Sequence, residues 1–149
     1  MTATGHAIIG TVIAAKIGNP ALAIPIAIAS HVAADYFPHW DFATNRKEKG
    51  KKKVLQDAQM DVIFGFILSF LVIELLFPFV NLAYAFVIII AAQALDWLMA
   101  PYYFWNIKFE PFVWSYKFQK KIENRLDKPW GIINQVAILI LLVILAKIF

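Results

Sequence analysis

The sequence contains no cysteine and few charged residues. Only 16% of its 149 residues are charged and 61% are hydrophobic, whereas soluble domains have about a quarter charged and about 45–50% apolar residues. The missing cysteine excludes disulfides, thiolate nucleophiles, iron–sulfur clusters and cysteine-type zinc sites. The scarcity of charge argues against a water-soluble domain. A metal site in this chain must therefore be built from histidines and carboxylates.

The short length and the uncharged start of the chain exclude further arrangements. A chain of 149 residues has room for about five membrane crossings of ~20 residues each, which leaves too little for a separate soluble enzyme domain. Residues 1–5 contain no lysine or arginine, so the basic region of a signal peptide is missing and we expect the first segment to be retained. Any active site must then lie at the ends of the helices.

Five apolar runs and one amphipathic segment organise the chain. Gly18-Asn19-Pro20 separates two short runs and predicts a tight hairpin, which either crosses the membrane or re-enters on the same side. Residues 78–81 separate two full-length runs. Between 109 and 127, large apolar residues recur every four positions, which is typical of an amphipathic helix on the membrane interface. The predicted helices are 4–17, 20–37, 55–80, 82–104, 109–127 (interfacial) and 130–148. Together they predict one all-α domain over 1–149, an integral membrane bundle of about five transmembrane helices.

The basic residues predict the orientation in the membrane. The formal net charge is +4, and five crossings place all of the 14 lysines and arginines except Lys16 and Lys147 on one face. The positive-inside rule makes this face cytoplasmic, with the N-terminus inside and the chain in the cell's inner membrane. We expect the polar segment from Arg46 to Lys53 to form a loop that binds anionic lipid headgroups, and we do not expect a nucleic acid partner.

Histidines and acids gather on the same predicted face. His31 and Asp35 are four residues apart and share one helical face, where two side chains can hold one cation. Pro38 disfavours further helix, so the chain can fold back and bring His39 and Asp41 to the same place. Further candidates stand at the ends of the neighbouring helices. The predicted metal ligands are His6, His31, Asp35, His39, Asp57, Asp61 and Asp96.

Imidazoles with carboxylates suit a divalent cation, and we expect one or two ions of zinc or manganese. Such a centre would activate water for hydrolysis, with Asp61 or Asp41 as the proton acceptor. Its depth among the headgroups predicts a lipidic ester or phosphoester as the substrate. Asp41 equally fits a cap on the basic segment. The alternative function is a metal-binding membrane protein without hydrolase activity, either an ion transporter or a structural scaffold.

The first 65 residues also resemble a known family. The similarity lies in Gly5-His6, in the run Ser30-His31-x3-Asp35-x2-Pro38-His39-x-Asp41, and in Asp61 on the next helix. This pattern is similar to predicted membrane-bound metal-dependent hydrolases, with a looser similarity to zinc-dependent phospholipase C-like proteins. The resemblance implies a metal-binding hydrolase with His6, His31, Asp35, His39 and Asp61 as ligands. The chain is shorter than this comparison would suggest, with little beyond the minimal bundle.

Overall fold

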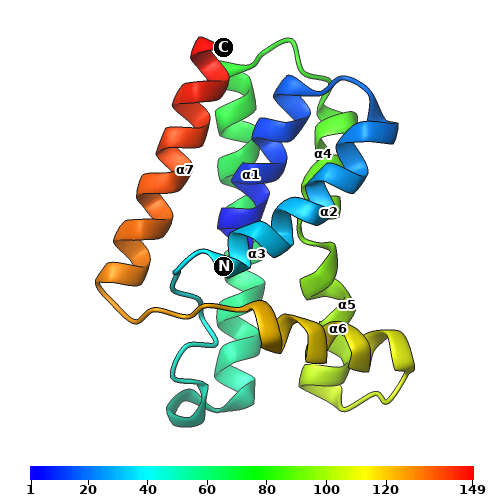
Figure 1. The fold of residues 1–149 in the computed structure, drawn as a ribbon, viewed down its shortest axis with the longest axis vertical. Coiled ribbons are helices and arrows are strands. Elements are labelled where there is room, and N and C mark those ends of the chain that lie inside the picture. The colour runs from blue at the N-terminus through cyan, green and yellow to red at the C-terminus, as the bar shows by residue number, and fades with distance from the viewer.

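The computed structural model is built of helices, as the sequence predicts. It describes the backbone of residues 1–149 and all side chains except those of Arg46 and Lys47. An isolated bridge between His39 and Arg125 adds a short extended pairing. Within the described residues the helices are α1 (Ala3–Lys16), α2 (Pro20–Tyr36), α3 (Arg46–Leu76), α4 (Leu82–Ala92), α5 (Ala94–Trp105), α6 (Glu110–Ile122) and α7 (Trp130–Ile148) (Figure 1).

The first two helices form the predicted short hairpin. α1 has 14 residues and α2 has 17, which correspond to about 21 and 26 Å of helix against a hydrocarbon core of ~30 Å. The side chain of Thr2 accepts a hydrogen bond from the Gly5 amide and caps α1. The side chain of Asn19 accepts from the Ala21 amide and caps α2. These caps explain why both helices begin where the sequence changes from turn residues to apolar ones.

Two helices are long and apolar enough to cross a membrane, and a bent pair provides a third candidate. The two are α3 from Glu48 onwards and α7, and the pair is α4 with α5. The structure divides the predicted helix over 82–104 into two, because the chain leaves the helical conformation at Gln93 and the two parts are bent by 51°. This bend turns α5 away from α1 and packs it against α6.

The basic segment is also more ordered than predicted. We expected a loop before a helix at residue 55, but α3 already begins at residue 46 and is interrupted at Gly50. Gly50 has φ +75°, a left-handed conformation that glycine adopts without steric cost. Lysine and glutamate are good helix formers, which explains the helical backbone. The predicted lipid contacts of Arg46 and Lys47 lie outside the described side chains.

α1 is the central helix of the bundle and packs against α2, α3, α4 and α7. Small side chains allow these helices to approach closely, and a Cβ on Gly10 would lie 2.9 Å from the Ile89 Cα in α4. Small residues of this kind are typical of helix interfaces in membranes. Large apolar side chains face outward instead, such as Leu75 on α3 and Ile148 on α7, which are 77% and 68% exposed. Outward-facing residues of this kind suit a lipid environment.

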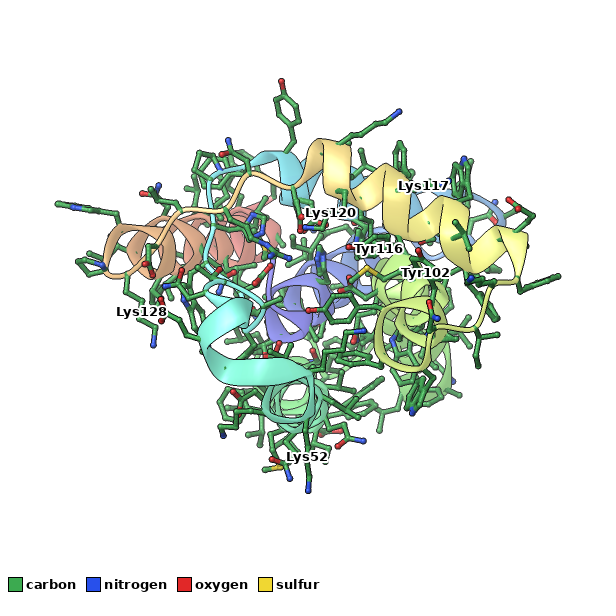
Figure 2. All side chains as sticks on the ribbon, turned by 90° about the horizontal axis from the view of Figure 1, so that it is seen from below. Lys52, Tyr102, Tyr116, Lys117, Lys120 and Lys128 are labelled. Carbon is green, nitrogen blue, oxygen red and sulfur yellow. The ribbon has the colours of Figure 1, made fainter. Side chains whose placement is uncertain are left out.

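α6 lies across one end of the bundle, where basic residues also gather (Figures 1 and 2). Its polar residues Ser115 and Gln119 face α5 and donate hydrogen bonds to the Leu95 carbonyl. Trp114 is exposed and stacks on Phe118. The helix ends at Ile122 rather than at residue 127, because residues 123–127 run extended beside the chain that follows α2.

Candidate metal centre

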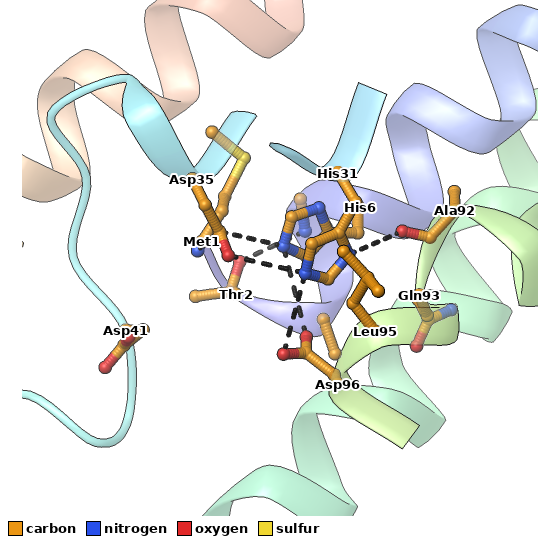
Figure 3. A network of polar contacts seen from close by, with 12 residues as sticks. Met1, Thr2, His6, His31, Asp35, Asp41, Ala92, Gln93, Leu95 and Asp96 are labelled. Atoms are coloured by element: carbon orange, nitrogen blue, oxygen red, sulfur yellow. Dashed lines mark hydrogen bonds and ion pairs between the residues drawn. The ribbon is translucent and has the colours of Figure 1, made fainter. Parts of the chain in front are cut away.

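Three helix ends bring two histidines and two aspartates together (Figure 3). His6 lies in the first turns of α1, His31 and Asp35 near the end of α2, and Asp96 in the first turn of α5. The imidazole rings of His6 and His31 are stacked, with centroids 3.8 Å apart and planes at 4°. Both histidines are buried. The bend at Gln93 therefore matters, because it directs the start of α5 towards the two rings.

His6, His31 and Asp96 form a group that could hold a metal ion, which we call the triad. One ligand atom of each lies within 4.8 Å of the others. The Asp96 carboxylate oxygens are 4.0 Å from Nε2 of His6 and 3.7 Å from Nε2 of His31. Ligand atoms of a tetrahedral zinc site with bonds of ~2.0–2.1 Å lie about 3.4 Å apart. The spacing of the triad is close to this value.

One hydrogen bond orients the His31 ring so that its Nε2 faces the other residues of the triad. His31 Nδ1 lies 2.8 Å from the Ala92 carbonyl oxygen, which can only accept, so Nδ1 donates, and in the neutral ring Nε2 carries the lone pair. Within the described part of the chain, Nε2 of His31 and both ring nitrogens of His6 are buried and make no hydrogen bond of ordinary geometry, although Asp35 lies within 3.3 Å of both Nε2 atoms. Burying such atoms unpaired costs about 1–3 kcal/mol each. A cation at the triad would satisfy two of them, so these residues fit a metal.

Asp35 lies on the other side of the same rings. Its carboxylate oxygens are 3.2 Å from Nε2 of His6 and 3.3 Å from Nε2 of His31, and the side chain is 5% exposed. It also contacts the amino group of Met1. Asp35 is thus placed to act as a further ligand or to balance the charge of a cation at the triad.

The loop after α2 folds back, as Pro38 predicts, and brings His39 next to Asp35. His39 Nε2 is 4.0 Å from Asp35 Oδ1 and 4.0 Å from Asp41 Oδ2. Nδ1 donates to the Phe37 carbonyl, and the His39 backbone pairs with Asn124 and Leu126. Burial lowers the pKa of the His39 imidazole below its ordinary value, which favours the neutral ring. His39 therefore lies beside the triad with a free lone pair.

Asp41 is held by a residue to which we gave no site role. Arg125 Nε is 2.9 Å from Asp41 Oδ2, and the same guanidinium contacts Glu123. From the sequence, Arg125 is one basic residue among many on this face, and no local motif marks it. Only the extended pairing of 123–127 with the loop after α2 brings it to Asp41.

Asp57 and Asp61 share one face of α3, but other groups bind them. Asp57 forms an ion pair with Lys53 at 2.6 Å. Asp61 accepts hydrogen bonds from the backbone amides of Ala3 and Thr4 at 2.6 and 3.2 Å, and from the Thr4 hydroxyl at 2.6 Å. Asp61 thus holds the first turn of α1, where a carboxylate also interacts well with the helix dipole. Roles for these two aspartates as metal ligands stay predictions.

A cavity of about 1000 Å³ opens beside the triad and reaches between α3 and α5. Asp96 belongs both to the triad and to the cavity wall, and its side chain is 31% exposed. Asp41, Asp61 and Arg125 also line the cavity. A small molecule in this space can therefore approach the triad from the side of α5.

The structure brings together only some of the residues on which the family resemblance rests. His6, His31, Asp35 and His39 come together, while Asp61 is bound to the start of α1. Asp96, which completes the triad, lies outside the residues that carry the resemblance. Membership of that family stays a prediction. Comparison with models of protein families, with curated proteins and with solved structures finds no match for this chain.

Proposed function

We propose that this chain is a membrane-embedded, metal-dependent hydrolase of lipidic esters or phosphoesters. The observation that supports it is the triad, where two buried imidazoles and the nearby Asp35 meet a second aspartate, Asp96, on a cavity wall. The pairing of two imidazoles with carboxylates favours zinc or manganese.

Each residue of the centre then has a defined task. His6, His31 and Asp96 hold the cation, and Asp35 and His39 lie within reach as further ligands, including for a second ion. When bound, the cation lowers the pKa of a water molecule and polarises an ester or phosphoryl oxygen. Asp41 would accept the proton released from that water, and the contact with Arg125 holds this carboxylate in position. Asp61 is the alternative proton acceptor on the cavity wall.

The surroundings of the centre support a lipidic substrate and a membrane location. The cavity adjoins α3, one of the helices that is long and apolar enough to cross a membrane. Trp97 and Trp105, which line it, are 51% and 59% exposed, as is typical of aromatic residues at the interface. We propose that the chain crosses the inner membrane about five times with this end in the cytoplasm.

Elemental analysis of the protein purified in mild detergent tests the metal centre. The wild type should carry close to stoichiometric zinc or manganese, and the variant His31→Ala/Asp35→Ala should lose it. Glu74→Ala is the matched control, because Glu74 is an exposed acid on the far part of α3. Absence of metal from the wild type after reloading with either ion would remove the hydrolase mechanism.

The metal-loaded protein is then incubated with mixed bacterial lipid extract, and the products are identified by mass spectrometry. We expect release of a headgroup or an acyl chain by the wild type and none by the double variant. Intact phosphoesters and carboxylic esters would reject hydrolysis. Cation flux in proteoliposomes would in that case indicate a transporter, and its absence a scaffold.

A further inference from the structure

The cavity between α3 and α5 has an apolar part and a polar part. Met60 and Ile63 of α3 and Trp97 of α5 form apolar walls and are each more than half exposed. Asp96 joins the cavity to the triad, and Asp41 and Arg125 line the cavity as an ion pair. A ligand that fills this space must therefore be amphiphilic.

The packing of the helices explains why the cavity reaches the side of the bundle. α3 packs against α1, whereas α5 packs against α6 and the end of α2. Since the chain bends at Gln93, α5 diverges from the axis that α4 follows, and the space opens between α3 and α5. The apolar stretch of α3 begins at Val62 and Ile63, the last α3 residues of the cavity wall, so we expect hydrocarbon chains of the bilayer to reach the opening from the side.

A buried polar atom supports the presence of a ligand. Gln93 lines the cavity, is fully buried, and its Oε1 has no hydrogen-bond partner within the described part of the chain. An unpaired amide oxygen in this position suits a hydroxyl or amide donor near the polar end of the ligand. A volume of about 1000 Å³ is at the upper end of the ~300–1,000 Å³ typical of ligand sites, larger than a small metabolite needs.

We propose that this cavity binds a lipid with one hydrocarbon chain between α3 and α5 and its phosphoester or carboxylic ester at the triad. For the chemistry at the polar end of the lipid, this inference rests on the proposed function. The position of the hydrocarbon chain rests on the cavity alone. Asp96 and Asp41 would repel an anionic headgroup, so a phosphoester requires the cation at the triad together with Arg125. An uncharged chain enters without the cation. The two requirements can therefore be tested separately.

The first probe is dodecylphosphonate, a single chain on an anionic headgroup that has no ester bond to hydrolyse. Retention by the zinc-loaded protein is counted by native mass spectrometry. We expect one bound molecule, and no comparable binding of methylphosphonate, which has the headgroup without the chain. Equal binding of methylphosphonate would overturn the proposal, because the chain would then contribute nothing.

Two variants obstruct the cavity from opposite walls. Ala100→Trp on α5 and Met60→Trp on α3 place an indole in the space for the chain, and should each weaken binding at least tenfold. Both positions can accept a larger side chain without disturbing the core, since Met60 is 65% exposed and Ala100 is half-buried. Ala137→Trp on α7 is the matched control, an exposed helical alanine away from the cavity. Unchanged affinity in both obstructed variants would overturn the proposal.

Dodecanol binding to the zinc-free protein separates this proposal from the proposed function. If the wild type binds no zinc but retains dodecanol, and both obstructed variants lose dodecanol, the binding site for the hydrocarbon chain is supported and the hydrolase function is rejected. If zinc binds at the triad but the obstructed variants retain both probes as the wild type does, the binding site for the hydrocarbon chain is rejected and the metal centre is supported.

Discussion

At the scale of single residues, each acid of this chain is distinguished by its partners. Asp96 faces two buried imidazoles and a cavity, whereas Asp57 forms an ion pair with a lysine. Asp61 holds backbone amides of α1. Spacing along a helix is the same for a ligand pair and for an ion pair, so the sequence pattern alone does not separate these roles.

Asp61→Ala should destabilise the fold, because it leaves the amides of Ala3 and Thr4 without their acceptor. The loss of a helix-capping carboxylate costs about 0.5–2 kcal/mol. Unfolding by denaturant in detergent micelles measures the change. Asp57→Ala serves as the control, since the Lys53 ion pair that it removes lies at the surface and contributes at most about 1 kcal/mol. Equal stability of Asp61→Ala and the wild type would contradict the capping role.

Metal binding should depend on Asp96 and not on Asp57. Asp96→Ala removes an oxygen that lies 3.7 Å from His31 Nε2 and should lower zinc affinity by more than about tenfold. Asp57→Ala should leave affinity unchanged, because its carboxylate is bound by Lys53 at 2.6 Å. Competition with a chromophoric chelator measures both affinities. If Asp57→Ala lost as much zinc as Asp96→Ala, Asp57 and Asp96 would both reach the ion, which would contradict this prediction.

At the scale of helices, close packing of α1 on its neighbours positions His6. α1 contacts four other helices, and glycine lies where α1 meets α4. Large side chains at such contacts would separate the helices and move His6 away from the start of α5. Because lipid is as apolar as the bundle interior, this packing relies on close van der Waals contact.

Gly10→Val should therefore destabilise the bundle by about 1–3 kcal/mol. A Cβ at this position would lie 2.9 Å from the Ile89 Cα and 3.0 Å from the Ala92 Cβ, so the backbones must move apart. Gly18→Val is the matched control, because a Cβ there meets nothing within 4 Å. Thermal unfolding followed by circular dichroism compares the two. Since Ala92 also accepts from His31, the Gly10 variant should lose zinc as well.

At the scale of the whole molecule, basic residues gather at the end of the bundle where α6 lies, and Gln119 and Arg125 at this end line the cavity beside the candidate centre. Lys52, Lys117, Lys120 and Lys128 all lie at this end (Figure 2). The last residue of α7 lies at the opposite end, near the end of α3 (Figure 1). The positive-inside rule predicts that this end lies in the cytoplasm, which is a prediction open to direct test.

The absence of native cysteine makes this orientation directly measurable. Lys52→Cys and Phe149→Cys each introduce one exposed thiol at opposite ends of the bundle. In intact cells a membrane-impermeant maleimide should label Phe149→Cys and spare Lys52→Cys until the cells are opened. The reverse pattern would place the centre on the outer face, and labelling of both would reject a chain that separates the two ends by a membrane.

Much of the architecture follows from local patterns. Apolar runs, turn residues and Pro38 predict the helices, the short first hairpin and the loop that returns to His39. The bend at Gln93 has no comparable signal, because the run from 82 to 104 is predominantly apolar and neither Gln93 nor Asp96 predicts a break. The position of Asp96 depends on this bend.

The sequence by itself determined an all-helical, strongly apolar chain whose histidines and most of whose aspartates lie towards the ends of helices. Hydrophobic periodicity and charge are local properties, and these features need nothing more. Only the tertiary structure decided that Asp96 joins His6 and His31, that Arg125 holds Asp41, and that a cavity separates α3 from α5. These contacts join residues that are distant along the chain. They depend on the angles at which whole helices pack, and the spacing of side chains within one helix gives no information about those angles.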